Sequence, residues 1–463
     1  MNNIDIQKAK SIYFIGAGGI GMSALVRYFL AKGKNVGGYD KVASELSEQL
    51  IQEGADIHYE DDFENISPLF KNRGETLIII TPAVPTEHQE WTNFRNQGFK
   101  ILKRAEVLGQ ITQYTRGICI AGTHGKTTTS CMTAHLFKQS SLDCNAFLGG
   151  ILKNYDSNLM ISKASDFTII EADEYDRSFH WLSPYMAAIT SADPDHLDIY
   201  HTEEAYHESF VHFASLIKEN GALIIRKGLP LKIKLKDNVR LYTYSAEEGG
   251  DFHAENIEIA NGEIFFDFIS PKGIIKNIQL GVPMKINIEN GIAAMALAWL
   301  NGMTDQEIRQ GMASFEGPKR RFDFQIKNEK IVFIDDYAHH PKELEASIES
   351  VKQLYPDKKL TLIFQPHLYS RTKDFHKEFA SVLSQADEVM LLDIYPAREE
   401  PIPGVSSQMI LDIMSKEVKK NVYTKENLLE NIRNKKIEIL LLAGAGDIDR
   451  LVKPIKKILE GNN

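Results

Sequence analysis

The stretch IYFIGAGGIGMS (residues 12–23) joins an apolar run to a glycine-rich turn and then to residues that are compatible with a helix. Gly16, Gly18 and Gly21 have the G-x-G-x-x-G spacing, in which backbone N–H groups at the start of a helix receive a diphosphate. Asp40 ends the next strand-like run, near the position where dinucleotide-binding proteins carry an acidic residue. The stretch therefore predicts a Rossmann-like α/β unit, and taken alone it favours NAD as the ligand.

A second phosphate-binding loop, AGTHGKTTT, follows about a hundred residues later. Gly122 and Gly125 let backbone N–H groups approach an anion, Lys126 supplies a point charge, and Thr127 can offer its hydroxyl to magnesium. The next residues are compatible with a helix, which would place the phosphates at a helix N-terminus. The strict Walker spacing is not met, because Ile120 occupies the place of the first glycine.

The rest of the chain continues the alternation of strand-like and helix-like segments, which is typical of parallel sheets covered by helices. At 463 residues the length fits three domains of about 150 residues, and we place them at 1–107, 108–316 and 317–463. Within the second domain, residues 221–282 alternate apolar and polar side chains and predict antiparallel strands. A helix is predicted over 289–303.

The composition narrows the class of protein. The chain is 43% hydrophobic and 25% charged, which is ordinary for a globular protein. Its net charge of −10 argues against nucleic-acid binding, because a phosphate backbone requires a basic face. No apolar run is long enough to insert into a membrane and no signal peptide is recognisable, so we expect a cytoplasmic protein. Cys119, Cys131 and Cys144 lack metal-site spacing and are expected to be reduced core residues.

Polar residues follow several of the strand-like runs, where ligands of open α/β sheets bind. Glu171 follows one apolar run and His196 another. A carboxylate and an imidazole near a triphosphate could hold a hard cation, although magnesium usually prefers oxygen ligands. Each could instead only cap a strand or satisfy a loop, and the sequence leaves that alternative open.

Eight motifs occur in order across almost the whole chain: GAGGIGMS, GTHGKTTT, EADEYD, DPDHLDIY, GPKRRFD, DDYAHHP, QPHLYSR and EEPIPGV. The ordered set resembles the Mur ligases. The resemblance implies a Rossmann-like N-terminal domain that binds the UDP of a sugar substrate, a central P-loop ATPase-like domain that binds ATP, and a Rossmann-like C-terminal domain. A UDP-sugar carries a diphosphate as NAD does, so the glycine-rich turn is expected to bind a UDP-sugar.

Within this family the motifs are most similar to those of the ligases that add the first amino acid of the peptidoglycan stem peptide. That resemblance implies ATP-dependent joining of L-alanine to the lactyl carboxylate of UDP-N-acetylmuramate through an acyl phosphate, with Mg2+ as cofactor. One alternative is the recycling ligase that attaches a preformed tripeptide to the same sugar nucleotide. A remote alternative is an NAD-dependent dehydrogenase, for which no motif marks a hydride-transfer site.

The resemblance also implies the site residues. The UDP-sugar is expected at Gly16, Gly18, Gly19, Gly21, Met22, Ser23 and Asp40. ATP is expected at Gly122, Thr123, His124, Gly125, Lys126, Thr127, Thr128, Asn287, Asn290, Arg320, Arg321 and Asp336. The amino acid is expected at Tyr337, His340, His367 and Arg371, and the metal at Thr127, Glu171 and His196. The expected catalytic residues are Lys126, Glu171, His196, Arg321 and His339.

Three positions depart from the family patterns. Leu368 stands where an arginine is common, so one expected substrate contact is missing. Ile286 stands in place of the usual histidine before Asn287. Sister ligases that add later residues carry a carbamylated lysine near the position of Phe210, and its absence fits a ligase that adds the first residue.

Overall fold

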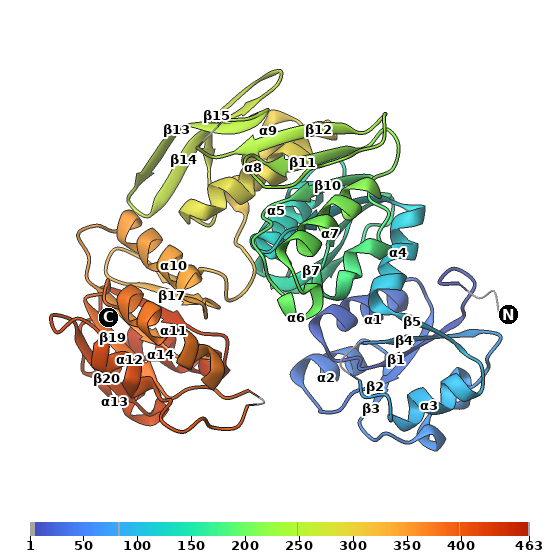
Figure 1. The fold of residues 1–463 in the computed structure, drawn as a ribbon, viewed down its shortest axis with the longest axis horizontal. Coiled ribbons are helices and arrows are strands. Elements are labelled where there is room, and N and C mark those ends of the chain that lie inside the picture. Colours follow the sequence, from blue (N-terminus) through green and yellow to red (C-terminus); the bar gives the residue numbers. More distant parts are fainter. Residues whose placement is uncertain (1–4, 82–83, 248, 398, 462–463) are drawn as a thin grey trace. The chain divides into compact units, whose positions relative to one another are not determined.

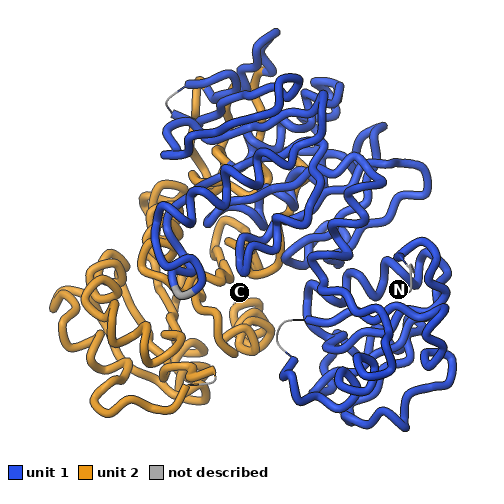
Figure 2. The backbone as a smooth tube through the Cα atoms, turned by 45° about the vertical axis from the view of Figure 1, so that its right-hand side comes forward, with its two compact units in different colours: residues 1–254, 268–275, 290–312 blue, residues 255–267, 276–289, 313–463 orange. Residues whose placement is uncertain are grey.

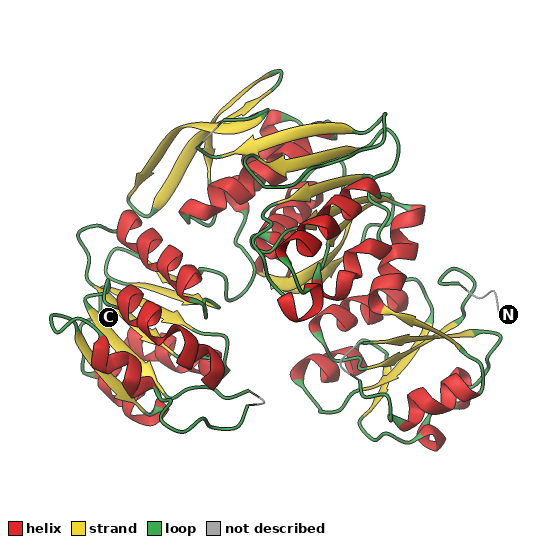
Figure 3. Cartoon of the chain, viewed as in Figure 1, coloured by secondary structure: helices red, strands yellow, loops and turns green. Residues whose placement is uncertain are grey.

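Three β-sheets, each with its own helices, make up the chain (Figures 1 and 3). The structure is a computed structural model that describes residues 5–81, 84–247, 249–397 and 399–461. Strands and helices alternate along most of the chain, and the predicted class of three α/β domains is confirmed.

The N-terminal sheet is entirely parallel and has the order β3-β2-β1-β4-β5. Its strands are β1 (Ser11–Ile15), β2 (Asn35–Tyr39), β3 (Asp56–His58), β4 (Thr76–Ile80) and β5 (Lys100–Lys103). The helices are α1 (Ile20–Ala31), α2 (Glu45–Gln52), η1 (Phe63–Asn65), η2 (Pro68–Phe70), α3 (Gln89–Asn96) and α4 (Arg104–Tyr114). The chain reverses its direction of travel across the sheet at β1, where open α/β sheets bind ligands, and the glycine-rich turn follows that strand.

The central sheet has ten strands in the order β15-β14-β13-β12-β11-β10-β6-β9-β7-β8. They are β6 (Arg116–Ala121), β7 (Asn145–Leu152), β8 (Ser157–Met160), β9 (Phe167–Glu171), β10 (Met186–Ile189), β11 (Ala222–Arg226), β12 (Arg240–Ser245), β13 (Phe252–Ala260), β14 (Glu263–Ser270) and β15 (Gly273–Gln279). The helices are α5 (Lys126–Lys138), η3 (Lys153–Tyr155), η4 (Tyr175–Trp181), α6 (Leu197–Tyr200), α7 (Glu203–Ser215), α8 (Lys285–Leu300) and α9 (Asp305–Ser314). The second phosphate loop follows β6, which lies between β9 and β10.

The prediction of antiparallel strands over residues 221–282 is wrong for part of that segment. β11 pairs in parallel with both β10 and β12, and β12 pairs in parallel with β13. An alternating pattern indicates that one face of a strand is buried, but it carries no information about the direction of the neighbouring strand. A loop without a helix joins β11 to β12, so the usual signal of a parallel crossover is missing there.

The C-terminal sheet has the order β16-β17-β21-β18-β19-β20. Its strands are β16 (Asp323–Lys327), β17 (Val332–Asp336), β18 (Leu360–Phe364), β19 (Glu388–Leu392), β20 (Lys419–Tyr423) and β21 (Ile439–Ala443). The helices are α10 (Pro341–Leu354), α11 (Tyr369–Leu383), α12 (Ser407–Ile413), α13 (Lys425–Arg433), η5 (Asp447–Leu451) and α14 (Val452–Gly461). Among the described strands of this sheet only the edge strand β16 is antiparallel, and the buried strands β17 (VFIDD), β18 (LTLIF) and β21 (ILLLA) are mostly apolar.

By packing, the chain forms two compact units (Figure 2). The first comprises residues 1–254, 268–275 and 290–312, and the second comprises 255–267, 276–289 and 313–463. In the first unit one contiguous apolar cluster contains residues of both the N-terminal and the central sheet. The domain boundaries predicted after residues 107 and 316 stay predictions.

Two further observations concern the cysteines and membrane-spanning helices. The three cysteines are free and buried, as expected. Within the described part of the chain, no helix has the length and apolar character that a membrane crossing requires.

Candidate functional site

The glycine-rich turn follows β1 and leads into α1. Gly16 adopts φ +89°, a conformation that L-residues rarely take, and a side chain there would clash with Thr81. Gly19 is the N-cap of α1. The N–H of Gly18 donates to Oδ2 of Asp40 at 2.6 Å, so a carboxylate of the protein itself accepts from this predicted phosphate-binding N–H.

Two predicted UDP-sugar residues, Met22 and Ser23, lie in the first turns of α1 and are almost fully buried. Ser23 donates its hydroxyl to the carbonyl of Ile20 at 2.9 Å. Only their backbone could therefore face a phosphate. The side chain of Asn158, from β8, donates to the carbonyl of Ile20 and so ties the turn to the central sheet.

The second loop has the conformation expected of a phosphate cradle. Gly122 and Gly125 have φ +140° and +83°, and α5 begins at Lys126. The ammonium of Lys126 donates to the carbonyl of Gly122 at 2.6 Å and lies 2.7 Å from Oε1 of Glu174. Glu174 is 2% exposed and was not predicted as a site residue. Burial raises its pKa, against the effect of Lys126.

Residues that follow β10, one of the two strands next to β6, form hydrogen bonds with this loop. From the end of β10, Thr190 donates to the carbonyl of His124 at 2.6 Å, and Ser191 accepts from the N–H of His124 at 2.7 Å. The hydroxyl of Thr123 donates to the carbonyl of Asp193 at 2.6 Å. Predicted residue Thr128 lies in the first turn of α5.

Asn287 and Asn290, predicted to bind ATP, lie in the first two turns of α8 and are nearly fully buried. Asn290 accepts from the hydroxyl of Thr129 at 3.2 Å, directly behind the loop, and a Cβ on Gly125 would lie 2.6 Å from its Oδ1. The side chain of Asn287 donates to the carbonyl of Val282 at 3.2 Å.

The strand on the other side of β6 supplies the predicted metal carboxylate. Glu171 ends β9 and accepts from the hydroxyl of Thr127 at 2.9 Å and from the N–H of Gly149 at 3.0 Å. A side chain at position 149 would collide with that carboxylate, so the glycine pair within β7 leaves room for it.

His196 is not joined to these two residues by any contact among the described residues. It adopts φ +53° at the start of α6, its ring packs edge-on against Tyr175, and Nε2 lies 3.8 Å from Oδ2 of Asp195. In the part of the chain that the structure describes, no group of three or more His, Cys, Asp or Glu side chains is spaced to hold a metal. The hydroxyl and carboxylate beside the loop nevertheless fit magnesium, which takes oxygen ligands and keeps waters.

In the C-terminal domain, the two arginines of the GPKRRFD motif differ in their contacts. Arg320 donates to the carbonyl of Gly444 at 2.6 Å and lies 3.8 Å from Oδ2 of Asp335, which fixes it within the fold. Arg321 packs over the ring of Tyr337 and makes no ion pair with any described residue. Arg321 therefore keeps a guanidinium that a ligand could use.

Asp336, at the end of β17, is 5% exposed and accepts from the hydroxyl of Ser347 and the N–H of Phe322. Burial raises the pKa of Asp336, and the hydrogen bond from Ser347 opposes that effect. The carboxylate is therefore held from inside the domain, with little surface left for a nucleotide in this conformation.

The predicted amino-acid residues gather at the carboxyl ends of β17 and β18. Arg371 lies with Nη1 at 3.4 Å from Nδ1 of His367, and the rings of His339 and His367 lie 6.0 Å apart. Burial lowers the pKa of His367 to about 4, and Arg371 acts in the same direction. Burial also lowers the pKa of His339, while Glu343, 3.3 Å from its Nδ1, opposes the shift. In both imidazoles the lowered pKa favours the neutral form.

His340 lies beside this group as the N-cap of α10, and its ring packs against Phe375. Leu368, at the position where the family commonly has arginine, adopts φ +71° just before α11. A leucine in this region is a backbone outlier, and such outliers cluster at functional sites.

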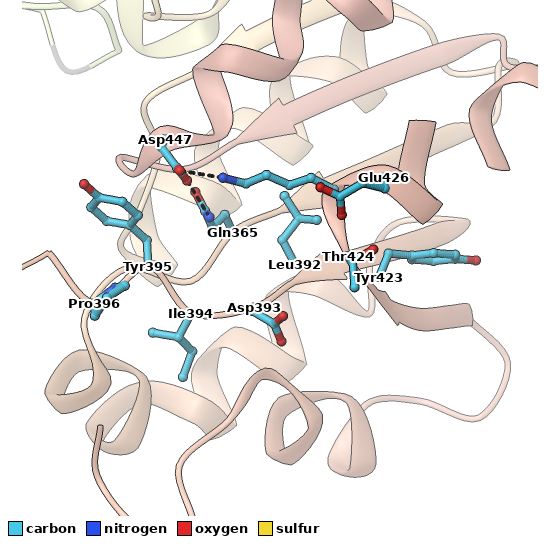
Figure 4. A pocket seen from close by; sticks show the side chains of 11 residues that line it. Gln365, Leu392, Asp393, Ile394, Tyr395, Pro396, Tyr423, Thr424, Glu426 and Asp447 are labelled. Atoms are coloured by element: carbon cyan, nitrogen blue, oxygen red, sulfur yellow. Dashed lines mark hydrogen bonds and ion pairs between the residues drawn. The ribbon is translucent and has the colours of Figure 1, made fainter. Parts of the chain in front are cut away.

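A pocket of about 400 Å3 opens at the carboxyl ends of β19 and β20 and adjoins this group (Figure 4). Tyr395, which stacks on His367 with ring centroids 5.7 Å apart, forms part of its wall. Lys425 and Gln365 both donate to Asp447 inside it. None of the residues predicted from the sequence lines this pocket.

Sequence reasoning missed Glu174, Gly149 and Arg104. Glu174 lies inside the quoted motif EADEYD, and the position of Gly149 in a glycine pair within the strand-like run NAFLGGIL was a usable signal. Arg104 begins α4 directly after β5, the same strand-to-helix position that identified the other site residues.

Models of three protein domains match the chain in succession. The "Mur ligase family, catalytic domain" matches residues 11–116, the "Mur ligase middle domain" matches 120–298, and the "Mur ligase, glutamate ligase domain" matches 320–448. Among solved structures, UDP-N-acetylmuramate-alanine ligase from Thermotoga maritima has a TM-score of 0.81 at 25% identity, covering 98% of this chain and 100% of that one. A murein peptide ligase from Psychrobacter arcticus has a TM-score of 0.64 at 20% identity, with 97% and 99% covered, and shares the fold.

Curated relatives are similar over nearly their full length. The chain is 62% identical over 456 residues to UDP-N-acetylmuramate–L-alanine ligase of Parabacteroides distasonis, covering 98% of both chains. It is 47% identical over 459 residues to the enzyme of the same name from Flavobacterium johnsoniae, covering 99% of this chain and 100% of that one. The three domain matches follow one another in the order of the three sheets, and we conclude that the chain belongs to the Mur ligase family.

Proposed function

We propose that this protein joins L-alanine to the lactyl carboxylate of UDP-N-acetylmuramate with consumption of ATP. The observation that carries the proposal is a P-loop whose lysine and threonine face two carboxylates, Glu174 and Glu171, in the same compact unit as a glycine-rich turn. Similarity to ligases of that name over the whole chain supports the choice of substrates.

The reaction must activate the carboxylate, because an amine cannot expel oxide from it. An oxygen of the lactyl carboxylate attacks the γ-phosphorus of ATP, the bond to the bridging oxygen breaks, and ADP leaves. The amine of L-alanine then attacks the acyl carbon, phosphate leaves, and the amine releases a proton. The products are UDP-N-acetylmuramoyl-L-alanine, ADP and phosphate, in the cytoplasmic synthesis of peptidoglycan precursors.

In the first step Lys126 and Arg321 would stabilise charge on the transferring phosphoryl group. Thr127, Glu171 and His196 would hold Mg2+, which when bound screens the negative charge of the triphosphate and the carboxylate from each other. The oxygen ligands Thr127 and Glu171 lie together at the loop, which supports this assignment.

In the second step Arg371 would pair with the carboxylate of L-alanine, and Tyr337, His340 and His367 would line its place. Burial lowers the pKa of His339 and favours its neutral form, and its Nδ1 lies 2.9 Å from the carbonyl of Tyr337 and 3.3 Å from Glu343. That makes it a candidate to take the proton of the amine.

Phosphate release measured with ATP, Mg2+ and UDP-N-acetylmuramate tests the proposal. L-alanine should give one phosphate per amide formed, and neither the tripeptide nor a reaction without acceptor should exceed background. Release that depends on the tripeptide would instead identify the recycling ligase. Oxidation of NADH, without phosphate release, would identify a dehydrogenase.

A further inference from the structure

The side chain of Arg104 packs against the glycine-rich turn, although Arg104 lies in a different segment of the chain. Arg104 begins α4, after the edge strand β5, and its Nε donates to the carbonyl of Gly21 at 3.1 Å. A Cβ on Gly21 would lie 2.7 Å from Nε and 2.8 Å from Cζ of this arginine. Gly21 does not have a positive φ, so the guanidinium packed against its backbone is what requires a glycine there.

The charge of Arg104 has no ion-pair partner among the residues that the structure describes. Among the described residues no carboxylate lies within 4 Å of its guanidinium, and its single hydrogen bond is the one to Gly21. Burial lowers the pKa of Arg104, while the more distant Asp173 and Glu171 oppose that effect. A partly buried cation without a partner is costly, which indicates that an anion completes its environment.

Two other arginines of the first unit form ion pairs. Arg27 pairs with Glu53 at 2.8 Å, and Arg116 pairs with Asp166 at 2.7 Å. Arg116 is 46% exposed, so water would solvate it even without its partner. Arg104 therefore stands out by combining burial with the lack of an ion pair.

The position of Arg104 relates it to both phosphate loops. It contacts the glycine-rich turn directly, and the charge of Glu171, which accepts from Thr127 of the second loop, raises the pKa of Arg104. The segment around Arg104 also contacts η4 of the central domain. Lys103 lies 3.6 Å from Oδ2 of Asp176, and Gly109 of α4 packs so closely on Trp181 that a side chain could not be added.

We propose that Arg104 binds an oxyanion of the sugar nucleotide, either its diphosphate or its lactyl carboxylate, between the glycine-rich turn and the P-loop. The planar guanidinium can pair with either group through two parallel N–H donors. It would also offset the negative charge of Glu171 and Asp173, which otherwise repels an anionic substrate. This inference rests on the proposed function, because it takes UDP-N-acetylmuramate as the substrate.

Calorimetric titration of Arg104→Met with three ligands tests the inference and separates the two anions. UDP and UDP-N-acetylglucosamine carry the diphosphate but no lactyl carboxylate, whereas UDP-N-acetylmuramate carries both. If Arg104 binds the diphosphate, all three should bind at least about 30-fold more weakly than to the unchanged protein. If it binds the carboxylate, only UDP-N-acetylmuramate should weaken. In both cases ATP affinity should stay within about twofold.

Arg116→Met is the matched control, because it removes an exposed, paired arginine from the same unit. Unchanged affinities of Arg104→Met for all three ligands would overturn the inference. An equal loss of ATP and UDP-sugar binding would do the same, since it would mean that Arg104 only supports the fold. If Arg104→Met does not fold, Arg104→Lys keeps the charge and the aliphatic stem, and it should retain part of the affinity that a neutral side chain loses. Sugar-nucleotide affinity equal to that of the unchanged protein in Arg104→Lys would exclude paired binding by the guanidinium.

The unchanged protein separates this inference from the proposed function. If it binds UDP-N-acetylmuramate and makes amide from L-alanine, the proposed function holds whatever Arg104→Met does. If the unchanged protein binds none of the three ligands, both proposals fail together.

Discussion

The two glycine-rich loops of the first unit, the predicted sites of the UDP diphosphate and of ATP, have similar backbone arrangements but differ in their charged contacts. Each follows a parallel strand and leads into a helix, and positive φ angles occur at Gly16 in the first loop and at Gly122 and Gly125 in the second. In the first loop the carboxylate of Asp40 accepts from the N–H of Gly18. In the second loop the ammonium of Lys126 is neutralised by Glu174, with side chains only 15% and 3% exposed.

The difference lies in the group of each loop that a carboxylate contacts, a backbone N–H in the first and a lysine ammonium in the second. The first loop presents N–H donors and no cation of its own, and a carboxylate accepts from one of those donors. The second loop carries its own cation, which a buried carboxylate holds. Phosphates would replace an anionic partner in both loops, but only in the second would they compete for a lysine. For the first loop, a cation has to come from elsewhere, and Arg104 is the one in contact with it.

The largest effect that would sharpen this comparison is expected from Lys126→Ala. Loss of the lysine should lower the rate of amide formation at least about 100-fold, because a positioned cation on a transferring phosphoryl group stabilises the transition state by about 3 kcal/mol or more. Affinity for UDP-N-acetylmuramate should change less than twofold, since the first loop does not use this lysine. Single-turnover phosphate release and calorimetry measure the two quantities.

Lys138→Ala serves as the control for that experiment, because Lys138 ends the same helix and pairs with Asp143. Near-normal turnover of Lys126→Ala would show that the second loop does not bind the transferred phosphate. A parallel loss of UDP-sugar binding would show that the two loops are not independent.

The next effect concerns glycines at matched positions, Gly16→Ala and Gly125→Ala. Both have φ between +80° and +90°, and an added Cβ would meet Thr81 in the first loop and Asn290 in the second. We expect each variant to lose about 2–4 kcal/mol of unfolding free energy, from the strained φ and from the displaced neighbour. Gly16→Ala should weaken UDP-sugar binding alone, and Gly125→Ala should weaken ATP binding alone.

Gly33→Ala isolates the part of the loss that φ causes, because Gly33 has φ +71° and no atom within 4 Å of an added Cβ. It should cost about 1 kcal/mol in urea unfolding. If all three variants lose the same unfolding free energy, Thr81 and Asn290 must move aside for the added side chain at little energetic cost.

A smaller effect is expected from Glu174→Gln. With the carboxylate gone, ATP no longer displaces a buried anion from Lys126, and its affinity should rise about fivefold at low salt. Asp143→Asn, which neutralises the partner of Lys138, is the control and should leave ATP affinity unchanged. Weaker ATP binding in Glu174→Gln would show instead that this carboxylate orients the lysine for the nucleotide.

The comparison of the two loops also explains which features could be predicted from the sequence and which could not. Glycine spacing after an apolar strand has a direct backbone cause, so both loops and the domains that contain them could be predicted. Strand direction in the segment around β11 and β12 could not, because alternation carries no directional information. The partners of the loops were missed for a different reason: Glu174 and Arg104 reach them through tertiary contacts across 48 and 83 residues of sequence.

The structure also changes the interpretation of three residues that the sequence predicted to bind the sugar nucleotide. Asp40 was predicted from its position as a ligand of the sugar nucleotide, and the structure adds that it accepts from the turn itself. Met22 and Ser23 belong to the motif, yet their side chains lie in the core. A motif specifies the backbone path, whereas the side chains available to a ligand depend on how the helix packs.

The smallest effect is expected at Gly19, where only the ligand can respond to an added methyl group. Gly19 has φ −69° and ψ 148°, which any L-residue adopts, and no atom lies within 4 Å of an added Cβ. Alanine is a poorer N-cap than glycine but restricts the unfolded chain, and these two small effects oppose each other. We therefore expect Gly19→Ala to change the unfolding free energy by less than about 0.5 kcal/mol. If a diphosphate approaches the N-terminus of α1, the methyl group occupies its space, and UDP affinity should fall about threefold to tenfold with ATP affinity unchanged. Calorimetric titration with UDP measures this, and an affinity equal to that of the unchanged protein would place the diphosphate away from Gly19 and break the analogy between the two loops.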